Sequence, residues 1–578
     1  MIASEPLHHF VDDYLHSLHE SNPTAATLDG VHLFDDLLDD FSRTSIDSQI
    51  QALSGFARRL ASISNSSLTA IERIERPMVA AHIQSKLHDL EQVRAWERNP
   101  QIYGEMLGAS LAGQALFDYA PAEERARRVL SKLRQAPKLV QAARDNIKEP
   151  PGIFVKKGLQ TLRGALRFID VDLPKAFADV DDLSVLSDLA DAQIEASDAL
   201  KGYVDYLEND LGPKARASFR LGPERLAQKF RLEEGLELPL ARLLDIGLRE
   251  LGLVQEEFRR AASKIDRGDP VGVWRRVKET RLVTDGIVNA AQRQVSALAA
   301  FIERKDLVSL PSGEPVIAAP TPEFFRWTGA SMWTPGPFEA RPTRAYYYLT
   351  DADPAWSDEQ KAEHYKDLNL PTLWSISIHE VYPGHYLHFQ HLRHVESRAR
   401  KSLLMASSAM VEGWAHYCEH MMMEAGFEKQ DPAVHLGQLA ESLIRIARLI
   451  VAIRLHAEDM SVEQGVRFFR DEAFVEESTA RREAERGTFD PGYAVYTLGK
   501  LMLLKLREDY KANVGDTFSL RLFHDTLLRN GVSTIPVHRQ LLLGEHAGTA
   551  LESAGLKPRP PPDTDPKTDG AWSRSTGG

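Results

Sequence analysis

The chain has 578 residues, of which 43% are hydrophobic and 26% are charged, a composition typical of a globular protein with a large buried core. The formal net charge is −13 at pH 7 and no long Lys/Arg block offsets it, so we expect no nucleic-acid partner, because a phosphate backbone would be repelled. The single cysteine, Cys418, excludes an internal disulfide and a cysteine zinc cluster, so any metal would be held by histidine and carboxylate groups.

Targeting and membrane signals are missing from the expected places. The first residues, MIASEPLHHFVDDYLHS, do not show a basic segment followed by an apolar one. The most apolar later run, 443-LIRIARLIVAIRL-455, is interrupted by Arg445, Arg448 and Arg454, so we expect no membrane span. The sequence therefore predicts a soluble cytoplasmic protein in a reduced state, and nothing in it indicates an oligomeric state.

From Leu7 to about Leu211 the pattern is helical almost throughout. Apolar residues recur at three and four positions with charges between them, as in 127-RRVLSKLRQAPKLVQAARDNI-147. Proline and glycine interrupt this pattern in 212-GPKARASFRLGPE-224. We therefore expect an N-terminal helical half over residues 1–211.

Residues 212–556 are expected to form a second, catalytic helical half. A looser region runs from about Lys305 to Pro371, and within a β element at about 335–350 the run 345-AYYYLT-350 favours a short strand. Helices resume after Pro371, whereas 557–578 is rich in Pro, Asp, Gly and Ser and is expected to be a disordered tail. The predicted fold class is mostly α with one small β element.

A His-Glu pair stands in the stretch 376-ISIHEVYPGHYLHFQH-391. In the common H-E-x-x-H helix the two histidines are four residues apart and reach one zinc ion, while the glutamate faces the bound water. Here His379 and Glu380 are followed by His385, six positions after the first histidine. At about 100° per residue, a regular helix would turn these two rings to different faces.

Pro383 and Gly384 lie between the two histidines and change this expectation. Proline removes a backbone donor and glycine tolerates conformations that other residues avoid, so we expect the helix to bulge here. A bulge that absorbs about two residues would bring His385 beside His379 as a metal ligand, with His388 and His391 as spare candidates. The alternative is a solvated surface helix in which the Pro-Gly pair ends one helix and starts another.

A third ligand is found in 410-MVEGWAHYCEHM-421. Glu412, His416 and Glu419 share one side of a helix whose other side is apolar, and no Lys or Arg accompanies them. Glu412 follows the second histidine by 27 residues, enough for a return helix, so its carboxylate would complete a two-His, one-carboxylate set with an open position for water. Glu419 is the alternative ligand and otherwise a supporting residue. The competing interpretation is that this side of the helix faces solvent.

Two further segments carry candidate substrate groups. In 478-STARREAERGTFDPGYAVYTLGKLMLLKLRED-509, the Tyr496 phenol is a candidate donor to an oxyanion, and Arg486 or Lys500 a candidate anchor for a substrate carboxylate. The strand with Tyr347 is expected to pair edge-on with an extended substrate. Alternatively, these residues form ordinary core and surface-pair contacts.

Three ordered blocks, HEVYPGH at 379–385, VEGWAHYCE at 411–419 and PGYAVYTLGK at 491–500, resemble the signature blocks of the bacterial domain-of-unknown-function 885 family. The segment 22-NPTAATLDGVHLFDDLLDDFS-42 is similar to that family's opening block. The resemblance spans nearly the whole chain up to the tail. Members of this family are assigned to the Glu-zincin superfamily of zinc metallopeptidases.

The resemblance implies two helical halves around a substrate cleft, as in the angiotensin-converting-enzyme, oligopeptidase and thermostable-carboxypeptidase families. It also implies that His379, His385 and Glu412 bind zinc, that Glu380 is the general base and that Tyr496 donates to the oxyanion. The family block usually has an apolar residue at the position of His416, so the resemblance gives that histidine no catalytic role.

The function that these observations predict is zinc-dependent hydrolysis of a peptide or peptide-like amide. One rival is a non-haem iron enzyme, which uses the same two-His, one-carboxylate set but has no use for a carboxylate at position 380. A second rival is a metal-free helical binding scaffold, which predicts no bound metal.

Overall fold

The protein is described here from a computed structural model, which covers residues 6–283, 286–322, 329–353, 356–427 and 431–551. The predicted tail, 557–578, lies outside the described residues. The fold is mostly α with a small three-stranded sheet, which confirms the predicted fold class. Within the described ranges, no helix has the length and apolar character that crossing a bilayer requires.

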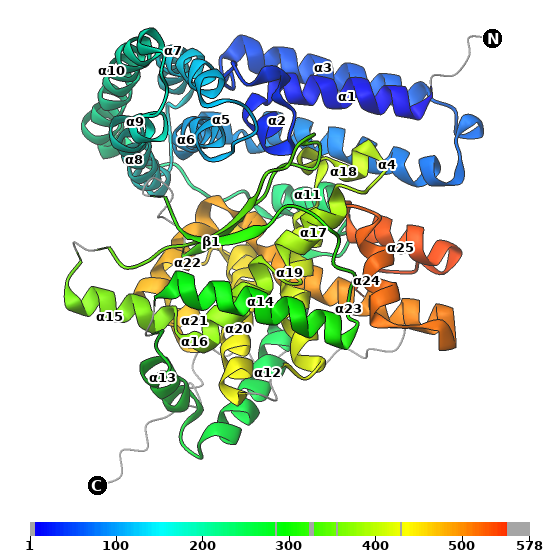
Figure 1. Ribbon diagram of the computed structural model, residues 1–578. Helices are drawn as coiled ribbons and strands as arrows, with labels where there is room; N and C mark the ends of the chain where they lie inside the picture. Colours follow the sequence, from blue (N-terminus) through cyan, green and yellow to red (C-terminus); the bar gives the residue numbers. More distant parts are fainter. Residues whose placement is uncertain (1–5, 284–285, 323–328, 354–355, 428–430, 552–578) are drawn as a thin grey trace.

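Helices from the first part of the chain form one tier of the molecule, the upper one in Figure 1. They are α1 (Leu7–Ser21), α2 (Pro23–Asp29), α3 (Arg43–Ser62), α4 (Ala70–His88), α5 (Ala95–Arg98), α6 (Gln101–Leu116), α7 (Ala122–Asn146), α8 (Gly152–Arg167), α9 (Leu173–Ala176) and α10 (Leu183–Asp205).

Most of the later helices form the lower tier in the same view (Figure 1). The later helices are α11 (Pro223–Glu234), α12 (Leu240–Ile265), α13 (Pro270–Thr280), α14 (Ile287–Lys305), α15 (Asp358–Asp367), α16 (Leu370–Glu380), α17 (His385–Leu392), α18 (Arg398–Lys401), α19 (Ser408–Glu424), α20 (Pro432–Ala457), α21 (Val462–Glu472), α22 (Glu477–Phe489), α23 (Val495–Val514), α24 (Leu520–Leu528) and α25 (Ile535–Leu543).

The sheet contains β1 (Val316–Pro320), β2 (Ala330–Trp333) and β3 (Ala345–Leu349). The predicted strand at 345–350 is β3, but it is the central strand, parallel to β1 and antiparallel to β2. Both edges of β3 are therefore already paired with other strands. The expectation that an extended substrate pairs with an edge of this strand is wrong. The sequence did not reveal β1 and β2, because they lie in a region where proline and glycine weaken the strand pattern.

Buried apolar side chains form separate clusters along the chain. One cluster runs from Leu38 to Ala215 and a larger one from Leu221 to Leu543. A third cluster packs side chains of α1, α3 and α4 against Met405 and Val537, which come from much later in the chain. The N-terminal helices are thus fastened to the later helices by a shared apolar core.

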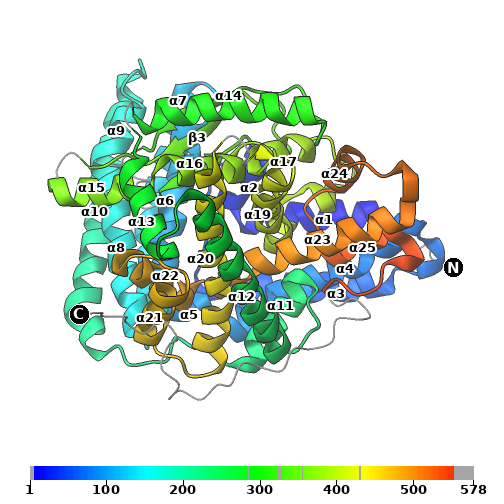
Figure 2. The same ribbon diagram turned by 90° about the horizontal axis from the view of Figure 1, so that it is seen from below.

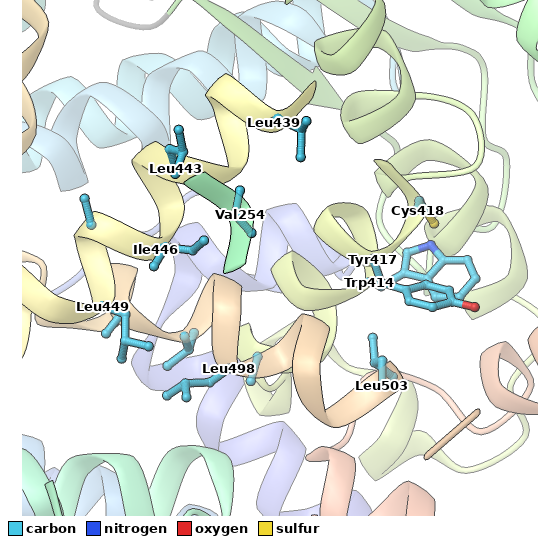
Figure 3. Close-up of a cluster of buried hydrophobic side chains, with 14 of the residues drawn as sticks. Val254, Trp414, Tyr417, Cys418, Leu439, Leu443, Ile446, Leu449, Leu498 and Leu503 are labelled. Carbon is cyan, nitrogen blue, oxygen red and sulfur yellow. The ribbon is translucent and has the colours of Figure 1, made fainter. Parts of the chain in front are cut away.

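Helix α20 runs through the centre of the lower tier, with α12, α16, α19 and α22 around it (Figure 2). It is apolar over most of its circumference, which is the pattern of a helix buried on all sides. Figure 3 shows a group of buried hydrophobic side chains that meet in this core. Labelled among them are Val254 of α12, Trp414, Tyr417 and Cys418 of α19, Leu439, Leu443, Ile446 and Leu449 of α20, and Leu498 and Leu503 of α23.

Helices α19 and α23 cross at a pair of glycines. A Cβ atom built on Gly413 would lie 2.5 Å from the Cα of Gly499, and one built on Gly499 would lie 2.1 Å from the carbonyl oxygen of Ala409. Only glycine permits two backbones to approach this closely. The crossing places the segment that contains Glu412 next to the segment that contains Tyr496.

We expect Gly499→Ala to lower the free energy of unfolding by about 1–3 kcal/mol or more, because the added methyl group overlaps the backbone of α19. The urea midpoint measures this change. Gly252→Ala is the matched control, since a Cβ at Gly252 on α12 would meet nothing within 4 Å, and it should stabilise the helix by up to about 1 kcal/mol. Equal midpoints for the two variants would contradict the close approach.

Candidate metal centre

Helix α16 positions the first histidine. The Asn369 side chain caps its N-terminus by accepting a hydrogen bond from the Thr372 amide, and Pro371 occupies the first turn. A Cβ on Gly437 would lie 2.9 Å from the backbone of Pro371, so α16 packs directly against α20. This packing holds the last turn of α16, with His379 in it, at a fixed place in the core.

The chain breaks between the two histidines. Helix α16 ends at Glu380 and α17 begins at His385, so the structure has two helices where the sequence predicted one bulged helix. Across the break the Gly384 amide donates to Ile378 O and the Leu387 amide to Val381 O, and both hydrogen bonds span six residues instead of the four of an α-helix. The connection therefore absorbs two extra residues, and this offset turns the second imidazole back toward the first.

The turn between α16 and α17 is held from two sides. A Cβ on Gly384 would lie 1.7 Å from the carbonyl oxygen of His379, so no other residue fits there without moving the backbone. On the other side, the Trp414 indole of α19 donates a 2.9 Å hydrogen bond to Pro383 O. The alternative correctly had one helix end and another start at the Pro-Gly pair, but its solvated surface helix is wrong, because His379 and His385 are 5% and 8% exposed.

Helix α19 supplies the carboxylates. The Ser407 side chain caps it, and the helix is buried around nearly its whole circumference. The side with Glu412, His416 and Glu419 therefore does not face solvent, as the competing interpretation had it. It faces α16 and α23, and the helix brings two carboxylates into an apolar core, where each needs a charged or polar partner.

The side chains of His379, His385 and Glu412 converge. In Glu412 the Oε2 atom lies 3.4 Å from Nε2 of each histidine, and the two rings are nearly perpendicular, with centroids 4.8 Å apart. Two ligand atoms about 2.1 Å from a tetrahedral zinc ion lie about 3.4 Å from each other. These three atoms thus have the spacing of zinc ligands around a common point.

Glu412 Oε2 also fits this role because its environment leaves it unsatisfied. The atom is buried and, within the described part of the chain, makes no hydrogen bond, since 3.4 Å exceeds the usual length of about 2.7–2.9 Å for a charge-assisted bond. A buried carboxylate oxygen without a partner is costly, and a metal ion between the three groups would satisfy it. The residues present therefore fit a zinc ion with a fourth position open to water or substrate.

Electrostatics keep the ligand set charged. Burial would raise the pKa of Glu412, but the imidazoles of His385 and His379 outweigh burial and hold this pKa well below its usual range. Burial and the Arg445 charge would lower the pKa of His379, yet the neighbouring carboxylates of Glu412 and Glu419 raise it to about 9. Without a metal, His379 is therefore protonated at neutral pH.

A buried layer behind His379 fixes the orientation of its ring. The Glu419 carboxylate, which is fully buried, accepts a 2.7 Å hydrogen bond from Nδ1 and so directs Nε2 toward the metal position. Ser375 donates to Glu419 at 3.1 Å, and Arg445 pairs with it at 3.1 Å. Glu419 is thus a supporting residue, not a ligand in the set.

The sequence analysis did not identify Ser375 and Arg445 as supporting residues of this site. An arginine inside the apolar run 443–455 is nevertheless a signal of a buried ion pair.

Tyr496 lies beside the ligands. Its ring is nearly parallel to that of His379, with centroids 6.4 Å apart, and the Arg448 guanidinium lies 5.2 Å from the tyrosine ring centroid. Burial, followed by the charge of Glu412, raises the pKa of Tyr496 to about 12, so the phenol keeps its proton at neutral pH. Arg486, the predicted substrate anchor, pairs with Asp490 at 2.8 Å, and its guanidinium lies 5.6 Å from the centroid of the Tyr493 ring.

Two other predicted substrate residues are held by partners away from the ligand set. Tyr347 is fully buried in β3, and its hydroxyl lies 3.1 Å from the Ser377 hydroxyl of α16. Lys500 is 3% exposed and donates a 2.9 Å hydrogen bond to Glu250. In this structure Tyr347 supports the helix of the first histidine and Lys500 ties α23 to α12.

The remaining histidines of the segment do not join the ligand set. His391 is hydrogen-bonded to Ser309 O at 2.9 Å, and His388 packs between the rings of Phe389 and Trp414. His416 is buried behind Glu419, with Nδ1 3.7 Å from Oε2. Burial lowers the pKa of both His388 and His416 to about 3, so both are neutral packing residues.

Glu380, the predicted general base, directly follows the first of the three converging residues in the chain. It is the last residue of α16 and is half-buried. It is not one of the three residues whose side chains converge. Among the described residues its carboxylate has no hydrogen-bond or ion-pair partner. An unpaired carboxylate next to a metal ligand is free to accept a proton.

Metal binding should release a proton, because a metal must displace the one that His379 holds below a pKa of about 9. As the pH falls from about 9 toward 6.5, the apparent zinc affinity should weaken by up to about tenfold per pH unit. Titration calorimetry in two buffers of different ionisation enthalpy measures the released protons. Binding without proton release would contradict the raised pKa.

Glu419→Gln should weaken zinc binding by about 10- to 100-fold, because the His379 ring loses its charged acceptor. Competition with a zinc-binding dye measures the affinity. Glu441→Gln is the matched control: it also removes a carboxylate from Arg445, but it has no contact with the ligands. Equal affinities for the two variants would show that Glu419 does not support the ligand.

The chain is similar to solved bacterial proteins and to one protein family. A solved protein of unknown function from Shewanella oneidensis, provisionally assigned as a lipoprotein, superposes with a TM-score of 0.77 at 26% identity and covers 93% of this chain and 100% of its own. A second solved protein, from Colwellia psychrerythraea and also provisionally assigned as a lipoprotein, has a TM-score of 0.78 at 19% identity. The match covers 94% of this chain and 99% of its own, which shows a shared fold. No curated protein matches. Residues 23–542 match the family described as "Bacterial protein of unknown function (DUF885)", and the chain belongs to this family.

Proposed function

We propose that the protein is a zinc-dependent hydrolase that cleaves peptide or peptide-like amide bonds, as in the Glu-zincin metallopeptidases. The observation that supports this proposal best is the convergence of two imidazole nitrogens on one unsatisfied carboxylate oxygen, each 3.4 Å away. Two nitrogens and one oxygen, with a fourth position open, are the ligand set of hydrolytic zinc sites. A zinc ion at this point would polarise the substrate carbonyl and lower the pKa of a coordinated water to about 7.

Glu380 and Tyr496 supply the remaining groups. Glu380 accepts the proton of the attacking water and passes it to the leaving nitrogen, a role that suits an unpaired carboxylate one residue from a ligand. Tyr496 donates a hydrogen bond to the oxyanion that develops on the carbonyl, since its pKa of about 12 keeps the phenol protonated. Arg448, whose guanidinium lies over the tyrosine ring, orients this donor.

One experiment tests the proposal against its rivals. Protein purified without chelator or nickel affinity is analysed for metals and then incubated with a mixed peptide library. Zinc at one ion per chain with peptide cleavage supports the hydrolase. Stoichiometric iron without cleavage supports the non-haem iron enzyme, and a protein that binds no metal supports the scaffold.

Glu380→Gln should keep zinc and lower the turnover number by at least about a hundredfold, since the general base is lost while the ligands remain. Metal content and kcat are measured on the same preparation. Glu412→Ala is the comparison variant: it should lose zinc as well as activity, because it removes a ligand. Full turnover in Glu380→Gln would remove this residue as the base.

A further inference from the structure

We propose that the C-terminal end of α12, with the turn after it, is a docking surface for an anionic lipid bilayer. This surface, the α12 tip, consists of Leu253, Arg260, Lys264, Ile265 and Arg267. Figure 1 shows that this end of α12 lies at the lower edge of the molecule, beside α13. The inference goes beyond the proposed function, because α12 carries none of the candidate metal ligands.

Positive charge is concentrated in the segment that contains this tip. The chain as a whole has a formal net charge of −13, whereas residues 259–281 hold eight Lys and Arg residues against three Asp and Glu residues. The rest of the chain therefore carries a net negative charge. A cationic end on an otherwise acidic protein attracts an anionic surface and turns that end toward it.

The acidic residues next to the tip are already paired, whereas its cations are not. The pairs are Glu256 with Arg259 at 2.6 Å, Glu257 with His435 at 3.3 Å and Asp266 with Arg276 at 2.5 Å. Arg260, Lys264 and Arg267 are exposed, and in the described part of the chain their side chains make no hydrogen bond or ion pair. Three charges thus remain available to an external partner.

The tip also presents apolar groups to solvent. Leu253, Arg260 and Lys264 stand at i, i+7 and i+11, so their side chains share one face of α12. Ile265 ends the helix, and Leu253 and Ile265 are 54% and 37% exposed. Aliphatic side chains beside unpaired cations suit the headgroup boundary of a bilayer, where the cations meet phosphates and the aliphatic groups leave water.

The same chemistry disfavours a nucleic acid as the partner. Proteins that bind single strands stack bases on aromatic rings, but the aromatic residues of this region, Phe258 and Trp274, are 0% and 5% exposed. A phosphate backbone also offers no apolar group to Leu253 or Ile265. A bilayer surface uses both the cations and the aliphatic side chains of the tip.

The test measures sedimentation of the full-length protein with lipid vesicles. One set of vesicles is phosphatidylcholine alone, and the other is phosphatidylcholine mixed with phosphatidylglycerol, which is anionic. We expect the protein to sediment with the anionic vesicles only. Raising the salt from about 0.05 M to about 0.5 M should lower the partition coefficient by at least about tenfold, because the ions screen the cations of the tip.

Variants locate the contact on the molecule. Arg260→Gln combined with Lys264→Gln should lower the partition coefficient by at least about tenfold, since each cation at an anionic surface contributes about fivefold. Ile265→Ser should lower it by about threefold or more, because an inserted aliphatic group is lost. The matched control is Arg58→Gln combined with Lys214→Gln. It removes the same charge from two exposed cations outside the tip and should leave binding unchanged.

Each contrary outcome overturns the inference. The lipid contact is wrong if the protein ignores anionic vesicles or binds both kinds of vesicle equally. It is also wrong if the Arg260 and Lys264 double variant binds like the wild type, because another face then makes the contact. Retention of duplex DNA through these two cations, without vesicle binding, would make the partner a nucleic acid. None of these measurements uses catalysis, so their failure leaves the proposed hydrolase standing.

Discussion

The candidate site depends on a two-residue offset in one backbone connection. Between α16 and α17, hydrogen bonds that span six residues replace the helical span of four, and this difference rotates His385 to face His379. The offset persists because the Gly384 Cα sits against a carbonyl oxygen, where a Cβ would lie 1.7 Å away, and because Trp414 holds the Pro383 carbonyl. A straight helix with the same residues would present two histidines on different faces and no site.

Buried charge is the second constraint on the site. Helix α20 carries Arg445 and Arg448 among many buried apolar residues, and each pairs with a buried carboxylate, Glu419 and Glu483 respectively. Removing one partner of such a pair leaves an uncompensated charge in the core, a far larger loss than that of a surface ion pair. The pairs therefore fix the rotation of α20 relative to α19 and α22, and through Glu419 they fix the ring of His379.

The supporting residues come from helices that are distant in the sequence but adjacent in space. The glycine crossing of α19 and α23 brings the Glu412 and Tyr496 segments together, and α20 lies beside both helices (Figure 2). The site is thus built on rigid buried helices. Glu412, whose side chain is 27% exposed, and Glu380, which is half-buried, are the parts of the site that remain partly open.

The amino-acid sequence by itself determined the helical class, the strand at Ala345–Leu349, and the ligand candidates His379, His385 and Glu412. It could do so because these features are local: apolar periodicity follows from helix and strand geometry, and residue type limits metal ligation. Tertiary structure decided what is not local. The β1 and β2 pairing that closes both edges of β3, the pairing of Lys500 with Glu250, and the Ser375–Glu419–Arg445 layer behind His379 all join residues whose separation in the sequence carries no periodic signal. Only packing, which must satisfy every buried charge at once, places them together.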